Sequence, residues 1–134
     1  NVTDYEIVKR DILADWEKFQ PRDVAFDTWN ATQIANDLMA AGVNMVQFIQ
    51  GPKSYNPAMA ALERAYLAGK LRHGNDPVLT WNMANVVPRF DQNKNVAPDK
   101  KRSPEKIDGA VALFMAAGRA DADLAEKSFW ETNG

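Results

Sequence analysis

The sequence predicts an α/β domain in which helices alternate with short buried strands, and two observations carry this prediction. Apolar residues recur at three- and four-residue spacing over several segments, which is typical of amphipathic helices. Two short apolar runs, DVAFD (residues 23–27) and NMVQFI (residues 44–49), have the length of buried strands. The order α-β-α-β-α, followed by an irregular β excursion and a last helix, indicates a layered domain with parallel strands.

The first helix is predicted over residues 5–19. Thr3 and Glu6 have the spacing of a capping box at its start, and Gln20-Pro21 ends it. One apolar stripe runs along the helix: Tyr5, Val8, Ile12, Trp16 and Phe19. This stripe indicates a helix that packs one face against the rest of the domain.

Two further helices flank the second strand. The run TWNATQIANDLMAAG (residues 28–42) predicts a helix with Asn30 as its N-cap, Ile34 and Leu38 facing inward and Gly42 at its end. Asn56-Pro57 is an N-cap and N1 pair that predicts a third helix, with Met59, Leu62 and Tyr66 as its stripe and Gly69 past its end.

The stretch from residue 70 to residue 98 has weaker signals. Asp76-Pro77 could start a short helix that runs through Met83, or residues 79–87 could be mainly strand. The sequence around residues 92–94 has the form of a hairpin. Two parallel strands are too few for a sheet that is covered on both faces, so either this hairpin completes the sheet or further strands precede Asn1.

The last helix has the clearest start signals, Ser103 as N-cap and Pro104 at N1. Its inward-facing residues are expected to be Ile107, Val111, Phe114 and Met115. After Ala120 the chain becomes polar, so we expect a core domain over residues 1–120 and a frayed polar tail over residues 121–134.

The composition excludes several classes of site. Cysteine is absent from the 134 residues, which excludes disulfides, thiolate metal sites and cysteine nucleophiles. Sixteen basic and eighteen acidic residues give a formal net charge of −2, so the chain as a whole has no field that would attract nucleic acid. No apolar run approaches the roughly 18–20 residues of a membrane span, so no membrane contact is expected.

Two acidic residues are candidates for chemistry. Asp27 ends the first strand, where open α/β sheets form their sites. The alternative is an Asx turn that leads into the next helix. Asp108 shares a helical stripe with Val111 and Met115, and a buried carboxylate needs a cation, a donor or a metal as its partner. The alternative is an acid at the rim of the buried face that points into solvent.

Gly109 follows Asp108 directly. A glycine in an early helical turn costs about 1 kcal/mol relative to alanine, which indicates close approach of backbone or ligand at that point. Asp27 and Asp108 would together offer two hard oxygen ligands of the kind that Mg²⁺ or Mn²⁺ prefers.

Basic residues gather before the last helix. Between residues 89 and 106 six Lys or Arg stand against three acids, and Lys100, Lys101 and Arg102 form the densest part of the run. The run is either a solvated loop or a clamp on the phosphate backbone of nucleic acid beside the two acids.

Three stretches resemble the C-terminal nuclease domain of the large terminase subunit of tailed bacteriophages. They are VAFDTWNATQIANDL, the long segment from MVQFIQGPKSYNPAMAAL to TWNMANVV, and PDKKRSPEKIDGAVALFMAAGRA. They occur in the order of the family and lie within residues 5–120, most of the chain.

This resemblance implies a ribonuclease H-like fold and endonucleolytic cleavage of concatemeric DNA during genome packaging, with two divalent metal ions, Mg²⁺ or Mn²⁺. By the match, Asp27 is the acid of a later strand and Asp108 the acid of the final helix, and both would be catalytic metal ligands. The family's first strand with its leading aspartate, and its ATPase motor, are expected upstream of Asn1, so the resemblance implies a domain truncated at its N-terminus.

The resemblance also implies partners: double-stranded DNA, and in the intact system the ATPase domain, the small terminase subunit and the portal, in the cytoplasm of the bacterial host. Lys100, Lys101 and Arg102 would then be DNA contacts. The alternative is a non-catalytic module that binds DNA or assembles with itself, because an unfinished sheet exposes edges that a second copy can pair with.

Overall fold

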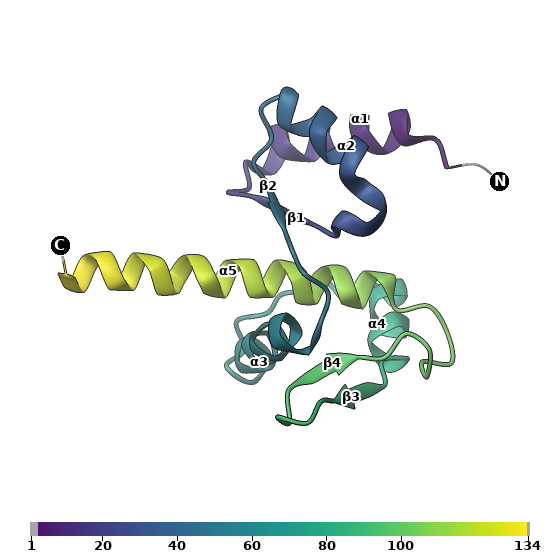
Figure 1. Ribbon diagram of the computed structural model, residues 1–134, viewed down its shortest axis with the longest axis vertical. Coiled ribbons are helices and arrows are strands. Elements are labelled where there is room, and N and C mark those ends of the chain that lie inside the picture. The colour runs from purple at the N-terminus through teal and green to yellow at the C-terminus, as the bar shows by residue number, and fades with distance from the viewer. Residues whose placement is uncertain (1–2, 134) are drawn as a thin grey trace. The chain divides into compact units, whose positions relative to one another are not determined.

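The computed structural model describes residues 3–133, which group into two compact units divided after Ile49. Each unit contains a small two-stranded sheet of its own (Figure 1). In the described residues the hairpin does not join the parallel strands, so the hairpin is not what completes the first sheet. None of the helices between residues 3 and 133 is long and apolar enough to cross a lipid bilayer.

The first unit follows the predicted α-β-α-β order. Its two strands run parallel, with Val24 opposite Met45 and Phe26 opposite Gln47. The prediction of two parallel strands, each followed by a helix, is confirmed. The elements are α1 (Tyr5–Phe19), β1 (Val24–Phe26), α2 (Thr28–Ala40) and β2 (Met45–Gln47).

Both helix starts in this unit differ from the expected caps. Asp4, not Thr3, caps α1, and its Oδ1 accepts a hydrogen bond from the Glu6 N–H at 3.0 Å. Asp27, not Asn30, caps α2, because the helix begins directly after β1. The predicted end of α2 is confirmed by Gly42, whose φ of 93° lies in the left-handed region that favours glycine.

The core of the first unit is small, and its strands are only half-buried. No residue of β1 or β2 is buried, so the expectation of buried strands is wrong. Strands become buried when helices cover both faces of their sheet, and a sheet of two short strands is too narrow for such cover. No residue of α1 is buried, although its apolar stripe was predicted to pack. The Lys9 Nζ donates to Asp37 Oδ2 at 3.1 Å and ties α1 to α2. The buried residues are Ala35, Leu38, Val43 and Phe48.

The second unit is built around one long helix. This helix, α5, packs against α3 and α4, with the antiparallel hairpin β3–β4 beside α3 (Figure 1). The elements are α3 (Pro52–Leu67), α4 (Pro77–Ala84), β3 (Pro88–Phe90), β4 (Val96–Pro98) and α5 (Asp108–Asn133). Its core consists of Tyr55, Ala58, Leu62, Ala97, Ile107, Ala110, Val111, Phe114 and Met115.

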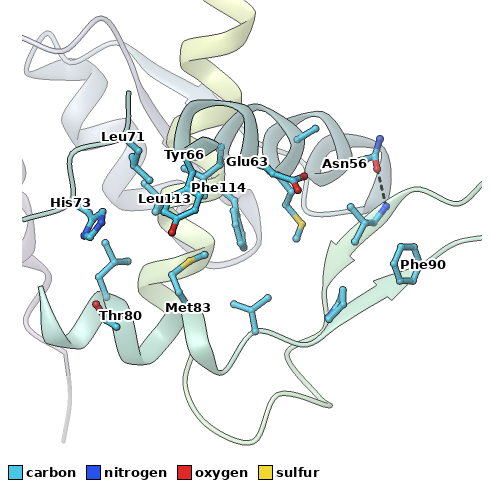
Figure 2. Close-up of a pocket in the computed structure, with 17 residues that line it drawn as sticks. Asn56, Glu63, Tyr66, Leu71, His73, Thr80, Met83, Phe90, Leu113 and Phe114 are labelled. Atoms are coloured by element: carbon cyan, nitrogen blue, oxygen red, sulfur yellow. Dashed lines mark hydrogen bonds between the residues drawn. The ribbon is translucent and has the colours of Figure 1, made fainter. Parts of the chain in front are cut away.

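Helix α3 begins before the predicted start. Gly51 is the N-cap and Pro52 takes the N1 position, where a proline loses no hydrogen bond. Asn56 therefore lies inside the helix, and its Oδ1 accepts from the Val96 N–H at 3.0 Å (Figure 2). The residue that looked like a helix cap instead ties α3 to β4.

Helix α4 and the hairpin confirm two of the weaker predictions. Asp76 caps α4 by accepting from the Leu79 N–H at 2.8 Å, so the helical alternative for this stretch is the correct one. The hairpin pairs Pro88 with Pro98 and Phe90 with Val96.

Helix α5 begins at Asp108, not after Ser103. The Ser103 hydroxyl donates to the Asp99 carbonyl at 2.7 Å and accepts from the Val87 N–H at 3.3 Å, so it is committed to the preceding turn. In the first turn of α5, the Gly109 N–H donates to Asn82 Oδ1 on α4 at 2.9 Å. The helix then continues past Ala120 to Asn133, so the segment expected as a polar tail is helical in the structure.

The turn of the hairpin is held by one carboxylate. Asp91 Oδ1 accepts from the backbone N–H groups of Asn93 at 2.9 Å and Asn95 at 2.8 Å, and Oδ2 accepts from the Asn95 side-chain amide at 3.0 Å. The Asn95 side chain is the largest cause that lowers the pKa of Asp91 from its ordinary value of 3.8. Hydrogen bonds to the ionised form have this effect because protonation would break them.

We expect the stability of the hairpin to decrease at low pH, where Asp91 becomes protonated. Because the folded-state pKa of Asp91 is lowered, its carboxylate stabilises the hairpin above 3.8, and this stabilisation is lost as pH falls through the folded-state pKa. An NMR titration of the Asp91 carboxyl carbon should therefore have its midpoint below 3.8. Asn95→Ala should raise that midpoint, whereas Asn93→Ala should not, because Asn93 donates only its backbone N–H. An equal shift in both variants would contradict the assignment.

Candidate active site and nucleic-acid interface

Asp27 lies between β1 and α2, at the carboxyl end of the strand, as predicted. Its Oδ1 accepts from the Trp29 N–H at 3.2 Å, so the Asx-turn interpretation describes its local geometry. The side chain is half-buried. The capping bond occupies one lone pair of one oxygen, and a carboxylate has about four such sites.

Polar groups from the neighbouring strand lie beside this acid. At the end of β2, Gln47 Nε2 donates to the hydroxyl of Thr28, the residue after Asp27, at 3.2 Å. Trp29 is 86% exposed, an unusual state for so large an apolar side chain. Asp27, Thr28 and Gln47 therefore gather at the carboxyl ends of the two parallel strands, the edge at which α/β sheets form their sites.

Asp108 is the first residue of α5, and its side chain is 76% exposed. The prediction that it lies on the buried stripe is wrong: Asp108 stands at the exposed end of the helix, whereas Val111 and Met115 of the same stripe are buried. The rim alternative is the correct one. In the first turn the carboxylate is favoured by the positive end of the helix dipole. It forms an ion pair with Lys100, whose Nζ lies 3.9 Å from Asp108 Oδ1.

Gly109 is explained by a neighbouring helix. A Cβ at this position would lie 3.4 Å from Asn82 Oδ1 and 3.9 Å from Leu79 Cδ1. The close approach that the glycine indicated is therefore made by the Asn82 side chain, which is 5% exposed and also donates to the Val78 carbonyl. Neither a ligand nor a distant backbone segment is needed to account for it.

The carboxylates of Asp27 and Asp108 are suitable ligands for a hard divalent cation, but they are only two. Asp27 belongs to the first unit and Asp108 to the second. Within residues 3–133, no group of three or more Asp, Glu or His side chains has a spacing that could hold a metal ion. A site that binds two metal ions usually has more protein ligands than two carboxylates.

The basic run forms an ordered turn, which we call the basic turn (residues 99–103). Asp99 Oδ1 accepts from the backbone N–H groups of Lys101 at 3.0 Å and Arg102 at 3.1 Å. The Asp99 carbonyl accepts from the Ser103 N–H at 3.0 Å. These bonds present the three cationic side chains of the turn to solvent, so it is exposed but not irregular.

Two of the three cations also line a pocket of about 450 Å³, which we call the basic pocket. Arg89 enters it from β3, because antiparallel pairing places this strand beside β4, which leads into the basic turn. The lining residues are Gln50, Tyr55, Arg89, Pro98, Asp99, Lys100 and Lys101. Sequence reasoning missed Gln50, Tyr55 and the grouping of Arg89 with the lysines, since only the hairpin brings them together.

A second and larger cavity, of about 860 Å³, lies among α3, α4, the hairpin and α5 (Figure 2). Its walls are mainly apolar, with Tyr66 from α3, Leu113 and Phe114 from α5, and Phe90 on the strand side. Glu63 and His73 are its charged or titratable groups besides Tyr66. No lysine or arginine of the described chain lines this cavity, so it does not suit a phosphate.

Comparison with known proteins matches the chain over nearly its whole length. The family described as "Terminase large subunit, endonuclease domain" matches residues 3–123, a span that includes both Asp27 and Asp108. The chain is 37% identical over 126 residues to the large terminase subunit of Enterobacteria phage HK97, which covers 92% of this chain and 25% of that protein. It is 38% identical over 96 residues to the protein YmfN of Escherichia coli (strain K12), which covers 70% of this chain and 21% of YmfN.

The structure agrees with these matches. The crystal structure of the HK97 bacteriophage large terminase superposes with a TM-score of 0.78 at 38% identity, over 87% of this chain and 25% of the other. The chain thus spans about a quarter of the length of the HK97 protein, and slightly less of the length of YmfN. With the family match over residues 3–123, these findings place the chain in the family of terminase large-subunit endonuclease domains.

Proposed function

We propose that this domain is a metal-dependent endonuclease that cleaves concatemeric DNA during genome packaging, with a ribonuclease H-like architecture. The observation that carries the proposal is the 37% identity to the HK97 large terminase subunit over 92% of this chain. The parallel pair β1–β2, with a helix after each strand, supports the architecture.

Asp27 and Asp108 are the proposed metal ligands. Bound Mg²⁺ or Mn²⁺ ions would activate a water molecule and stabilise the leaving oxygen of the phosphodiester. The bond from the Trp29 N–H holds the Asp27 carboxylate in one orientation and leaves its second oxygen available. Asp108 is exposed, so a cation can reach it without opening the core. Lys100 would balance the charge of Asp108 before a metal binds.

The proposal extends to partners that the whole protein would meet. Double-stranded DNA is the substrate, and Lys100, Lys101 and Arg102 on the basic turn would draw its phosphate backbone toward the domain. The ATPase domain, the small terminase subunit and the portal would assemble with it in the cytoplasm of the bacterial host.

A DNA-binding module without catalysis is the second candidate function. The observation that favours it is the pairing of Asp108 with Lys100, because an exposed carboxylate beside an exposed lysine is a common surface feature with no catalytic role. The two candidates differ in one outcome: only the endonuclease needs the carboxylates for a reaction.

The experiment that tests the proposal uses Asp27, because two substitutions separate its cap role from its ligand role. Asparagine caps a helix about as well as aspartate, whereas alanine costs about 1 kcal/mol. We expect the chain to nick supercoiled plasmid with Mn²⁺ and not with EDTA. Asp27→Asn should keep the thermal stability and lose nicking, whereas Asp27→Ala should lose nicking and also have a lower thermal stability.

Two results would overturn the assignment. If Asp27→Asn nicks at the rate of the unmodified chain, Asp27 is only a helix cap. If the unmodified chain neither nicks DNA nor binds Mn²⁺ in a calorimetric titration, the second candidate function stands in place of the first.

A further inference from the structure

We propose that the basic pocket binds a backbone phosphate of duplex DNA and so holds the strand beside Asp108. The proposal rests on the proposed function in taking DNA as the ligand, but it does not depend on metal or cleavage. It assigns a binding role to Arg89, a residue of β3 outside the basic turn, and gives the pocket a defined chemical class of ligand, the phosphodiester.

The pocket carries positive charge that is not fully compensated by nearby carboxylates. Three cationic side chains line the pocket, and within residues 3–133 neither the Arg89 guanidinium nor the Lys101 ammonium forms an ion pair with a carboxylate. The single acid in the lining, Asp99, directs its Oδ1 to two backbone N–H groups of the basic turn. A pocket with this imbalance attracts an anion.

The backbone that carries Arg89 and Lys101 is rigidly supported. Arg89 is held on a strand by its pairing opposite Ala97, which is fully buried. Lys101 is held by its backbone bond to Asp99, and the Asp99 N–H donates to the Val87 carbonyl at 2.8 Å. Their backbones are therefore fixed before a ligand arrives, so less entropy is lost on binding.

The pocket offers several kinds of hydrogen-bond donor. A guanidinium, two ammonium groups and the Gln50 amide line the same pocket of about 450 Å³. Phosphate oxygens accept from all of these groups, and guanidinium binds them in a planar, two-pronged geometry. Tyr55, which is 3% exposed, supplies a rigid aromatic wall.

Lys100 connects the pocket to the candidate catalytic acid. It lines the pocket, and its Nζ is 3.9 Å from Asp108 Oδ1. A phosphate in the pocket competes with Asp108 for this lysine. The cationic residues are all exposed at the surface, which suits a long polymer that runs past the pocket more than a small ion that must be enclosed.

The test is DNA binding in EDTA, measured by fluorescence anisotropy of a labelled duplex across a salt series. Arg89→Ala and Lys101→Ala should each weaken binding about tenfold, because each removes a charged hydrogen bond. Each should also lower the slope of log affinity against log salt by about 0.9, because each variant neutralises one phosphate fewer. Arg89→Lys should recover part of the affinity, since it restores the charge without the guanidinium geometry.

Lys106→Ala is the matched control. It also removes one exposed positive charge near Asp108, but Lys106 does not line the pocket. We expect its affinity to stay within about twofold of that of the unmodified chain and its slope to change little. An equal loss in Lys106→Ala would mean that only the general field matters, and unchanged binding in Arg89→Ala and Lys101→Ala would mean that DNA avoids the pocket. Either result overturns the proposal.

Two further arms separate related outcomes. Inorganic phosphate, added at constant ionic strength against chloride, should shift the NMR signal of the Arg89 side-chain N–H only weakly compared with duplex DNA. A strong shift with phosphate, together with unchanged DNA binding in the pocket variants, would identify a free-phosphate site and overturn the DNA assignment. Asp108→Asn should bind DNA in EDTA at least as tightly as the unmodified chain, so a failure of cleavage and a failure of the pocket give different results.

Discussion

Replacing Asp108 with asparagine is expected to lower the rate of Mn²⁺-dependent nicking of plasmid DNA by at least about a hundredfold. Substitution of a residue that only hydrogen-bonds to a metal ligand already lowers activity by up to about a hundredfold, and Asp108 is proposed to bind the metal directly. The asparagine keeps the size and polarity of the side chain but loses the negative charge that holds a hard cation. The measurement is the initial rate of nicking at saturating Mn²⁺.

Stability should change little in the same variant. The Asp108 side chain is 76% exposed, and its contact with Lys100 at 3.9 Å is a surface pair. We expect the free energy of unfolding to fall by less than about 1 kcal/mol, the size of a charge effect in a first helical turn. A loss of nicking with the fold intact is therefore a loss of chemistry.

Glu105→Gln is the matched control for this prediction. Glu105 is an exposed acid that precedes α5, and removing its charge should leave nicking unchanged. Lys100→Ala is also informative, because it removes the cation beside Asp108 and leaves the carboxylate in place. Full activity in Asp108→Asn would show that the helix acid binds no essential metal.

Phe114→Ala is expected to lower the free energy of unfolding by about 3–5 kcal/mol, the range for an aromatic ring removed from a core. Phe114 is 3% exposed and belongs to α5, the helix that packs against α3 and α4. Its ring also forms part of the wall of the apolar cavity (Figure 2). The void left by the ring would join that cavity, so neighbouring side chains are poorly placed to fill it.

Phe129→Ala makes the same chemical change on the same helix and serves as the control. Phe129 is 59% exposed and has its ring contact with Trp130, its neighbour in the chain. We expect a change within about 0.5 kcal/mol, as for most surface substitutions. Urea unfolding followed by circular dichroism measures both variants, and similar losses in the two would contradict the core assignment of Phe114.

The positions of the helices and strands were largely predictable from local patterns. Residues 5–19 show the predicted helix with its predicted ends, and both parallel strands lie inside the apolar runs that indicated them. These elements depend on periodicity over a few turns, and a sequence shows that directly.

Helix starts were less predictable, because several residues can serve as a cap and only one does. Ser103 has every local feature of an N-cap, yet its hydroxyl bonds to Asp99 and Val87 instead. The acceptor at the start of α5 is Asn82, 27 positions from Gly109 in sequence. No short pattern contains a bond of that span.

For the candidate site, too, some features were predictable from the sequence and others only from the structure. The order of residues is enough to identify the groups available for chemistry: Asp27 at a strand end, Asp108 near a helix start, and a basic run between residues 89 and 106. The exposure of Asp108, and the pocket that Arg89 shares with Lys101, became visible only in the folded chain. Chemical identity and local periodicity belong to neighbouring residues, whereas exposure and the grouping of charges arise from contacts between elements far apart in the chain.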